Sequence, residues 1–133
     1  MWGLLEKTLS LVNIALKLRS YRHQLLSSNI ANVDTPGYRR KDLPFEKIFK
    51  KYFTEVKEKV LKTTRDKHFV TKPITPVDWK KEIEPFTLGT PNNVNLEEEM
   101  VSLTENQLLY EATLQALSKE LERLKEIITE GGR

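Results

Sequence analysis

The chain has 133 residues, of which 38% are apolar and 31% are charged, so it is too polar for a thick globular core and too apolar for a wholly disordered chain. It contains no cysteine, which excludes disulfide scaffolds, cysteine nucleophiles and thiolate metal sites. Its net charge of +3 is unevenly divided, because residues 1–84 carry eighteen bases against ten acids and residues 85–133 carry four bases against nine acids. A basic front and an acidic back can neutralise each other within one molecule or between neighbours in an assembly.

The first part of the chain predicts a long helix with a broad apolar face. One seam at helical spacing consists of Leu4, Leu11, Ile14, Leu18, Tyr21 and Leu25. A second apolar stripe lies beside it, and a face this wide favours packing against more than one helix. The apolar run Thr8–Leu16 is far shorter than the roughly 20 residues that span a bilayer, and charged residues flank it. We therefore expect neither an integral membrane protein nor a cleaved signal peptide.

The predicted helix ends in a stretch rich in turn-forming residues, 27–40. Asn29 and Asn32 tolerate irregular backbone, and Pro36 followed by Gly37 is a strong turn signal. Apolar side chains among these residues indicate that the loop packs against something, although a plain helix end and turn also fits the local chemistry. The candidate assembly motif is Ser28, Asn29, Ile30, Ala31, Asn32, Val33, Asp34, Thr35, Pro36, Gly37 and Tyr38.

The middle of the chain, residues 41–93, reads as a variable segment. Residues 44–62 predict a third, amphipathic helix with one apolar side and a lysine-rich remainder. Its apolar side would pack on the main hairpin, although a basic amphipathic helix can also lie on an anionic membrane surface. Residues 63–93 contain four prolines and short β-favouring pieces, so we expect an extended or flexible linker, with a small hairpin as a further option. Trp79 is a candidate docking aromatic there.

Residues 94–133 predict a long C-terminal helix. Asn95 can cap its start, Glu97–Glu99 suit the positive end of the helix dipole, and Gly131 can end it. Steps of four and three residues, sustained over four to five heptads, are typical of a coiled coil. Its seam consists of Leu96, Met100, Leu103, Tyr110, Leu114, Leu117, Leu121, Leu124 and Ile128, interrupted by Gln107.

These elements together predict a mainly α fold with three parts. The long N-terminal helix with its motif (1–40) and the C-terminal heptad helix (94–133) pair as an elongated coiled-coil hairpin, with the third helix and the proline-rich segment between them (41–93). Pairing within one chain is the simplest arrangement, and exchange of helices between chains is the alternative.

Catalytic chemistry finds little support in this sequence. His23 and His68 form no recognisable motif, and there is no Gly-rich phosphate loop. Three consecutive glutamates on a helix point about 100° apart and so do not converge on a metal ion. We therefore expect no enzyme activity, no catalytic or metal site and no cofactor. Nucleic-acid binding through the basic front remains an alternative, but the opposing acidic segment disfavours it.

The motif over Ser28–Tyr38 resembles the N-terminal signature of bacterial flagellar rod, hook and hook-associated proteins. Residues 93–100 and 106–110 resemble the matching C-terminal end of that axial family, and the two matches cover most of both ends of the chain. The short length and the tail from Leu117 to Gly131 are closest to the family's proximal rod branch, whose chains often carry a pair like Thr64 and His68.

This resemblance implies a structural subunit of the proximal rod of the flagellar basal body. Such subunits leave the cytoplasm through the type III export apparatus without a cleaved signal and assemble helically in the periplasmic rod. They connect the inner-membrane ring to the rest of the rod, with other rod subunits and the ring-to-rod adaptor FliE as neighbours. A soluble coiled-coil adaptor or export chaperone, which binds one partner helix without forming a filament, is the alternative from a different class.

Overall fold

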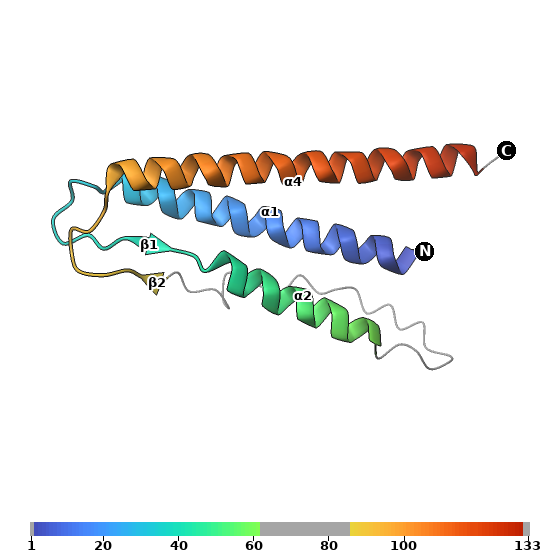
Figure 1. The fold of residues 1–133 in the computed structure, drawn as a ribbon, viewed down its shortest axis with the longest axis horizontal. Coiled ribbons are helices and arrows are strands. Elements are labelled where there is room, and N and C mark those ends of the chain that lie inside the picture. The colour runs from blue at the N-terminus through green and yellow to red at the C-terminus, as the bar shows by residue number, and fades with distance from the viewer. Residues whose placement is uncertain (1, 62–85, 132–133) are drawn as a thin grey trace.

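The computed structural model describes residues 2–61 and 86–131. The chain folds into three helices and a two-stranded ladder: α1 (Trp2–Ala31), β1 (Lys41–Asp42), α2 (Phe45–Leu61), β2 (Phe86–Thr87) and α4 (Leu96–Glu130). The prediction of a mainly helical fold with long N- and C-terminal helices packed together and a third helix is confirmed (Figure 1). Thr64, His68, Trp79 and the linker up to residue 85 lie outside the described residues.

The helix α1 lies between the other two helices. It contacts α4 along one side and α2 along another (Figure 1). This arrangement explains the width of its apolar face and confirms the expectation that α1 packs against more than one helix. The loop after α1 lies at one end of the elongated molecule, and the start of α1 and the end of α4 lie at the other (Figure 1).

The small apolar core lies between α1 and the β1–α2 segment. Leu18 and Leu25 of α1 are buried against Leu43 and Tyr52. Partly buried side chains pack around this cluster: Ile14, Tyr21, Phe45, Ile48 and Phe49. The N-terminal seam predicted from the sequence therefore packs largely against α2, and no residue of α4 belongs to the cluster.

The two strands join segments that are far apart in the chain. Lys41 pairs with Thr87 and Asp42 pairs with Phe86 in an antiparallel register. The predicted β-favouring piece at 85–88 does form a strand, but its partner is the segment after the motif instead of a neighbour within the linker. This ladder brings β2 and the start of α4 next to the motif loop.

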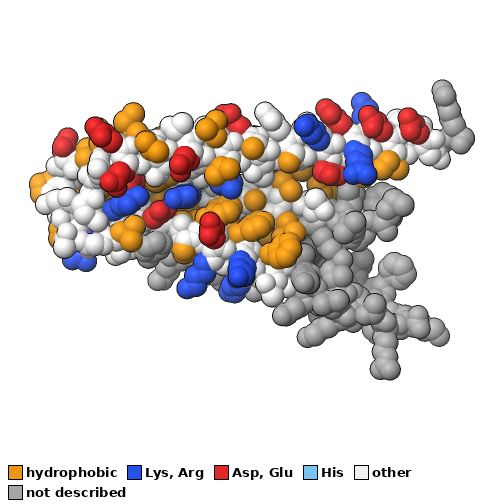
Figure 2. Space-filling model, in the orientation of Figure 1, with side chains coloured by type: hydrophobic (Ala, Val, Ile, Leu, Met, Phe, Trp, Pro, Cys, Tyr) orange, Lys and Arg blue, Asp and Glu red, His pale blue; other side chains and the backbone are white. Residues whose placement is uncertain are grey.

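The surface of α4 away from α1 carries many apolar side chains. Figure 2 shows them among acidic groups along this helix. Ten large apolar side chains of the described residues are at least 40% exposed, and nine of them belong to α4. Among the described residues, no helix is long and apolar enough to cross a membrane.

Candidate functional site

The candidate motif forms the last turn of α1 and the turns that follow it. The Asn32 backbone N–H donates to the Ser28 and Asn29 carbonyls at 3.1 and 3.2 Å. The Asn32 side-chain amide also donates to the Ser28 carbonyl at 2.7 Å, and its oxygen accepts from the Thr35 hydroxyl at 3.2 Å. A single asparagine therefore satisfies groups on both sides of the helix end, where intrahelical partners run out.

Asn29 is the centre of the hydrogen-bond network at this end of the hairpin. Its side chain is fully buried, and its amide donates to the Lys41 carbonyl at 2.7 Å and to a Glu99 carboxylate oxygen at 2.9 Å. Its oxygen accepts from the Lys41 N–H at 3.0 Å and from the Tyr38 hydroxyl at 3.1 Å. Two donors and two acceptors are the full capacity of an asparagine side chain, so no other residue type can replace it without loss.

Tyr38 extends the network to the motif's first residue. Because the proton of its hydroxyl goes to Asn29, the Ser28 hydroxyl, 3.2 Å away, acts as the donor to Tyr38. The conformation of the loop between these two residues is therefore fixed from both of its ends.

Glu99 is the residue that joins the two halves of the chain. It lies in the first turn of α4, is fully buried, and forms an ion pair with Arg40 in addition to the bond from Asn29. A buried carboxylate is stable only when its charge and its oxygens find partners, and both partners come from the motif segment. All three glutamates lie in the first turn of α4 as predicted, with Glu97 and Glu98 exposed at the cap, but Glu99 has an additional role as the buried partner of Arg40 and Asn29.

Two asparagines before α4 form hydrogen bonds with residues 37–40, the end of the motif and the residues after it. The Asn92 side-chain oxygen accepts from the Gly37 N–H, and the Asn92 N–H donates to the Tyr38 carbonyl, both at 2.8 Å. The Asn93 oxygen accepts from the Arg40 N–H at 3.1 Å. Asn92 has a φ of 61°, a left-handed conformation that asparagine adopts more readily than most residues. Asn92 was not among the predicted site residues, although two asparagines after Pro91 are a turn signal.

We call this set of residues the junction: Asn29, Tyr38, Arg40, Asn92, Asn93 and Glu99. A bidentate pair between Arg22 and Asp42 supports it from α1, with N···O distances of 3.0 and 3.3 Å. Asp34–Gly37 are exposed at the tip of the loop. The junction thus fixes the angle at which α1 and α4 leave the loop, while the tip of the motif remains accessible.

A second polar contact lies farther along the α1–α4 interface. Asn106 is buried, and its amide donates to the Arg19 carbonyl at 2.9 Å. The Arg19 guanidinium lies 4.3 Å from the centre of the Phe45 ring, so one residue of α1 contacts both of the other helices. Burial lowers the pKa of Arg19, and the neighbouring Arg22 charge adds to this effect. A buried asparagine in a helix–helix seam fixes the register of the two helices.

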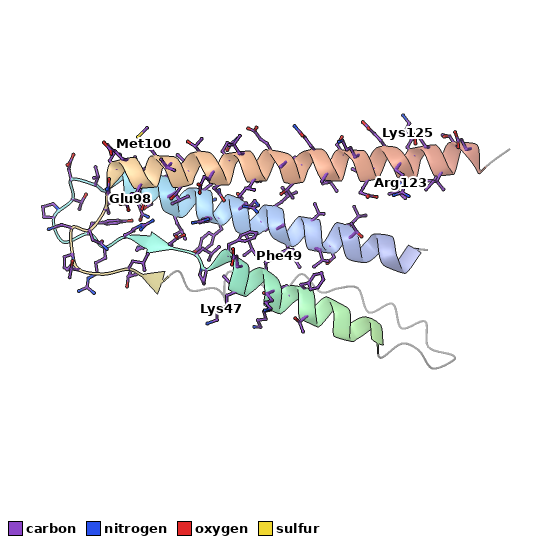
Figure 3. The ribbon with its side chains drawn as sticks, viewed as in Figure 1. Lys47, Phe49, Glu98, Met100, Arg123 and Lys125 are labelled. Atoms are coloured by element: carbon purple, nitrogen blue, oxygen red, sulfur yellow. The ribbon has the colours of Figure 1, made fainter. Side chains whose placement is uncertain are left out.

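The structure places the predicted α4 seam in two different environments. Its first row is half-buried beside α1: Leu103, Tyr110, Leu117 and Leu124. Its second row and its first residue are exposed: Leu96 (42%), Met100 (55%), Leu114 (40%), Leu121 (49%) and Ile128 (66%). Figure 3 shows Met100 pointing away from α1, whereas Phe49 of α2 points toward it.

Within one chain, α4 thus contacts α1 through a stripe rotated from the predicted seam. The row next to Leu103 and Tyr110 on the α1 side contains the buried Glu99 and Asn106. These two polar residues have hydrogen-bond partners on α1 and the motif, so α4 turns them inward and leaves apolar residues outside. Leu11, Ile14 and Tyr21 of the α1 seam are half-buried, and Leu4 lies in its first turns.

We define the exposed row as the outer stripe of α4: Leu96, Met100, Leu114, Leu121 and Ile128. No group of three or more metal-ligating side chains occurs within residues 2–61 and 86–131. The site therefore consists of the hydrogen-bonded junction and the exposed apolar outer stripe, which are features of a binding surface.

The motif lies in a part of the chain that matches a known protein family, and relatives match over most of the chain. A family model described as "Flagella basal body rod protein" matches residues 15–39, the second half of α1 and the motif. The protein of Aquifex aeolicus named flagellar basal body rod protein FlgB is 33% identical over 111 residues, which cover 80% of this chain and 81% of the relative. The proteins of that name from Aeromonas hydrophila and Escherichia coli are 31% and 29% identical and cover 90% and 96% of both chains.

Proposed function

Since the chain belongs to the FlgB family of flagellar basal body rod proteins, and its role in the rod is structural, we propose that it builds the proximal part of the rod. In this proposal the subunits assemble helically through their terminal helices and help to connect the inner-membrane ring to the rest of the rod. The motif loop packs between subunits, and the mature rod lies in the periplasm.

The observation that carries this proposal is the outer stripe of α4. Its members are 40–66% exposed, although they continue a heptad pattern that needs a partner helix. Monomers rarely expose so many large apolar side chains along one helix, and a surface of this kind marks a site of association. A rod subunit has neighbours that cover the row, so the lean core of the single chain is completed on assembly.

The mechanism is the burial of apolar area between subunits. At roughly 25 cal/mol per Å² of buried apolar surface, covering the outer stripe contributes several kcal/mol per contact before the entropy of association is subtracted. We therefore expect the free protein to be monomeric or weakly associated and to gain helical order on assembly. Circular dichroism and native mass spectrometry measure both quantities.

The expected neighbours and the route to the rod are also part of the proposal. Other rod subunits and the adaptor FliE would contact this chain, and the type III export apparatus would deliver it without a cleaved signal peptide. Extraction of basal bodies followed by mass spectrometry tests the first expectation, because the chain should remain with the ring and the proximal rod after outer parts are removed.

A pair of double variants tests the role of the outer stripe. Leu114→Asp with Leu121→Asp places two charges on exposed apolar positions, so the monomer should keep its helicity while rods fail to form and cells lose motility. Ala112→Asp with Gln115→Asp adds the same charge at exposed positions outside the stripe and serves as the matched control. Normal rods in the Leu114/Leu121 variant would contradict the proposal.

A further inference from the structure

The outward surface of α4 is acidic over its first two thirds. Between Leu96 and Ser118 this helix contains no lysine or arginine. It carries four exposed glutamates, namely Glu97, Glu98, Glu105 and Glu111, whereas Glu99 is buried and paired with Arg40. We call these four glutamates the acidic face. The Gln107 amide donates to Glu111 at 2.8 Å, a bond that leaves the negative charge in place.

The outward surface of residues 39–54, which include β1 and the part of α2 whose side chains the structure describes, is basic. Its exposed cations are Arg39, Lys41, Lys47, Lys50 and Lys51, against a single exposed acid, Glu46. Asp42, the other acid among residues 39–54, is paired with Arg22. We call these five cations the basic face. Phe53, on the same helix, is 49% exposed and supplies an apolar side chain near it.

The two faces lie on opposite sides of the molecule. The helix α1 separates them, because it contacts both α4 and α2, and no contact joins those two helices among the described elements. In Figure 2 acidic groups lie along α4 at the upper edge, with basic groups among them only toward its C-terminal end, and further basic groups lie at the lower edge. Figure 3 shows Lys47 pointing away from α1. The α2 lysines of one molecule therefore cannot neutralise the glutamates of its own α4, whereas Arg39 and Lys41 lie at the junction, where Arg40 pairs with Glu99.

We propose that the acidic face of one copy of this chain binds the basic face of the next copy, with the outer stripe of α4 covered in the same contact. This inference rests on the proposed function, because it specifies a contact between subunits of the rod. Among the side chains that the structure describes, the exposed charges of the two faces are opposite and equal: four glutamates face a net charge of +4 from five cations and Glu46. Phe53 meets apolar side chains such as Met100 and Leu114, which lie beside the glutamates.

A second copy is the occupant that accounts for both faces at once. An anionic lipid surface or a nucleic acid would bind the basic face but would leave the acidic face and the outer stripe without a partner. A contact between two different surfaces of the same molecule is heterologous, and it repeats from copy to copy without closing unless a rotation closes a ring. Such a contact generates a helical filament, which is the geometry that a rod requires.

Charge reversal on each face, singly and together, tests this contact. The first variant carries Lys47→Glu and Lys50→Glu, the second carries Glu105→Lys and Glu111→Lys, and the third carries all four changes. All four side chains are exposed, so circular dichroism should give the helicity of the natural chain for each variant. The natural chain and the variants are compared by sedimentation velocity at low salt and by recovery of rods from cells that produce only that variant.

We expect each double variant to lower the association constant by at least about tenfold, because like charges then face each other across the contact. The variant with all four changes should recover association and rods, and so should an equimolar mixture of the two double variants. The association of the natural chain should also weaken as salt is raised, because salt screens exposed charges. A matched pair with Lys17→Glu and Lys119→Glu, which lie outside both faces, should associate like the natural chain.

Several results would overturn the inference and leave the rod function standing. One such result is that the natural chain forms rods but the variant with all four changes associates as poorly as the double variants. The acidic and basic faces would then bind different partners and not each other. Another is a natural chain that binds anionic phosphatidylserine vesicles through Lys47 and Lys50 and does not self-associate. By contrast, a natural chain that is absent from isolated basal bodies would overturn the proposed function itself.

Discussion

The two surfaces of α4 differ in which side chains they bury and which they expose. On the side of α1 and the motif, its polar residues Glu99 and Asn106 are buried and bonded to partners. Away from α1, nine of its large apolar side chains are exposed, Met100 and Ile128 among them. An ordinary amphipathic helix turns its apolar residues inward, whereas α4 also buries two polar residues and leaves most of its large apolar side chains exposed. Specific polar bonds thus orient α4 against α1 and the motif, and most of the large apolar side chains of α4 are left exposed.

The largest expected effect comes from removal of the buried carboxylate. Glu99→Ala leaves Arg40 without its ion-pair partner and the Asn29 amide without one of its two acceptors, so we expect the free energy of unfolding to fall by about 3–5 kcal/mol. Urea unfolding followed by circular dichroism measures this change. Glu98→Ala, one residue earlier and exposed, is the control and should change stability by less than about 1 kcal/mol. Equal losses in both variants would show that the junction does not determine stability.

Two leucines, one buried on α1 and one exposed on α4, should respond differently to truncation. Leu26 is fully buried, so Leu26→Ala should cost about 3 kcal/mol of unfolding free energy through lost burial and the cavity left behind. Leu114→Ala, at a position that is 40% exposed, should cost much less in the monomer and instead reduce assembly. Chemical unfolding and rod recovery, measured on both variants, separate the two effects. A Leu114→Ala monomer as unstable as Leu26→Ala would contradict the assignment of the outer stripe to contacts between chains.

Two glycines near the junction should differ in their tolerance of a side chain. Both adopt left-handed backbone, with φ of 77° at Gly37 and 65° at Gly89, so an alanine at either position costs about 1–2 kcal/mol. A Cβ at Gly37 meets no atom within 4 Å, whereas one at Gly89 lies 2.6 Å from the Asn93 amide nitrogen, which donates to the Leu88 carbonyl. Gly89→Ala should therefore lower the thermal midpoint more than Gly37→Ala. The opposite order would mean that the Asn93 bond is dispensable.

The smallest effect is expected at the helix cap. The Asn95 side-chain oxygen accepts from the Glu97 N–H at 3.1 Å, so Asn95→Ala should cost about 1 kcal/mol and Asn95→Ser much less. The cap lies beside the junction but does not belong to it. A loss as large as that of Glu99→Ala would show that the cap and the junction act as one unit, and a double-variant cycle with Glu99→Ala measures that coupling.

Much of the fold could be predicted from local patterns. The helices, the cap at Asn95 and the end near Gly131 follow from residues close together in the chain. The broad apolar face of the first helix correctly indicated two neighbours. Which of its stripes meets which helix could not be predicted, because α1 carries more than one apolar stripe and the choice depends on where the junction orients α4.

The site was predictable only on its N-terminal side. The motif from Ser28 to Tyr38 stands out by its turn-forming residues, whereas Glu99 was hidden in a run of three glutamates that a helix end explains equally well. Its bond to Asn29 joins residues 70 positions apart, and no local pattern encodes that distance. The assembly role of the motif and of the seam remains a prediction that the variants above address.

The position of the junction has a mechanical consequence. The start of α1 and the end of α4 lie together at one end of the molecule, and the junction lies at the other (Figure 1). Tension applied between the two ends of the chain would peel α4 from α1 one turn after another, so only a few contacts would resist at any moment. The junction would be the last structure to break, because its ion pair and hydrogen bonds lie farthest from the point of pulling. A single-molecule trace should accordingly show a low-force plateau that ends in one sharp rupture.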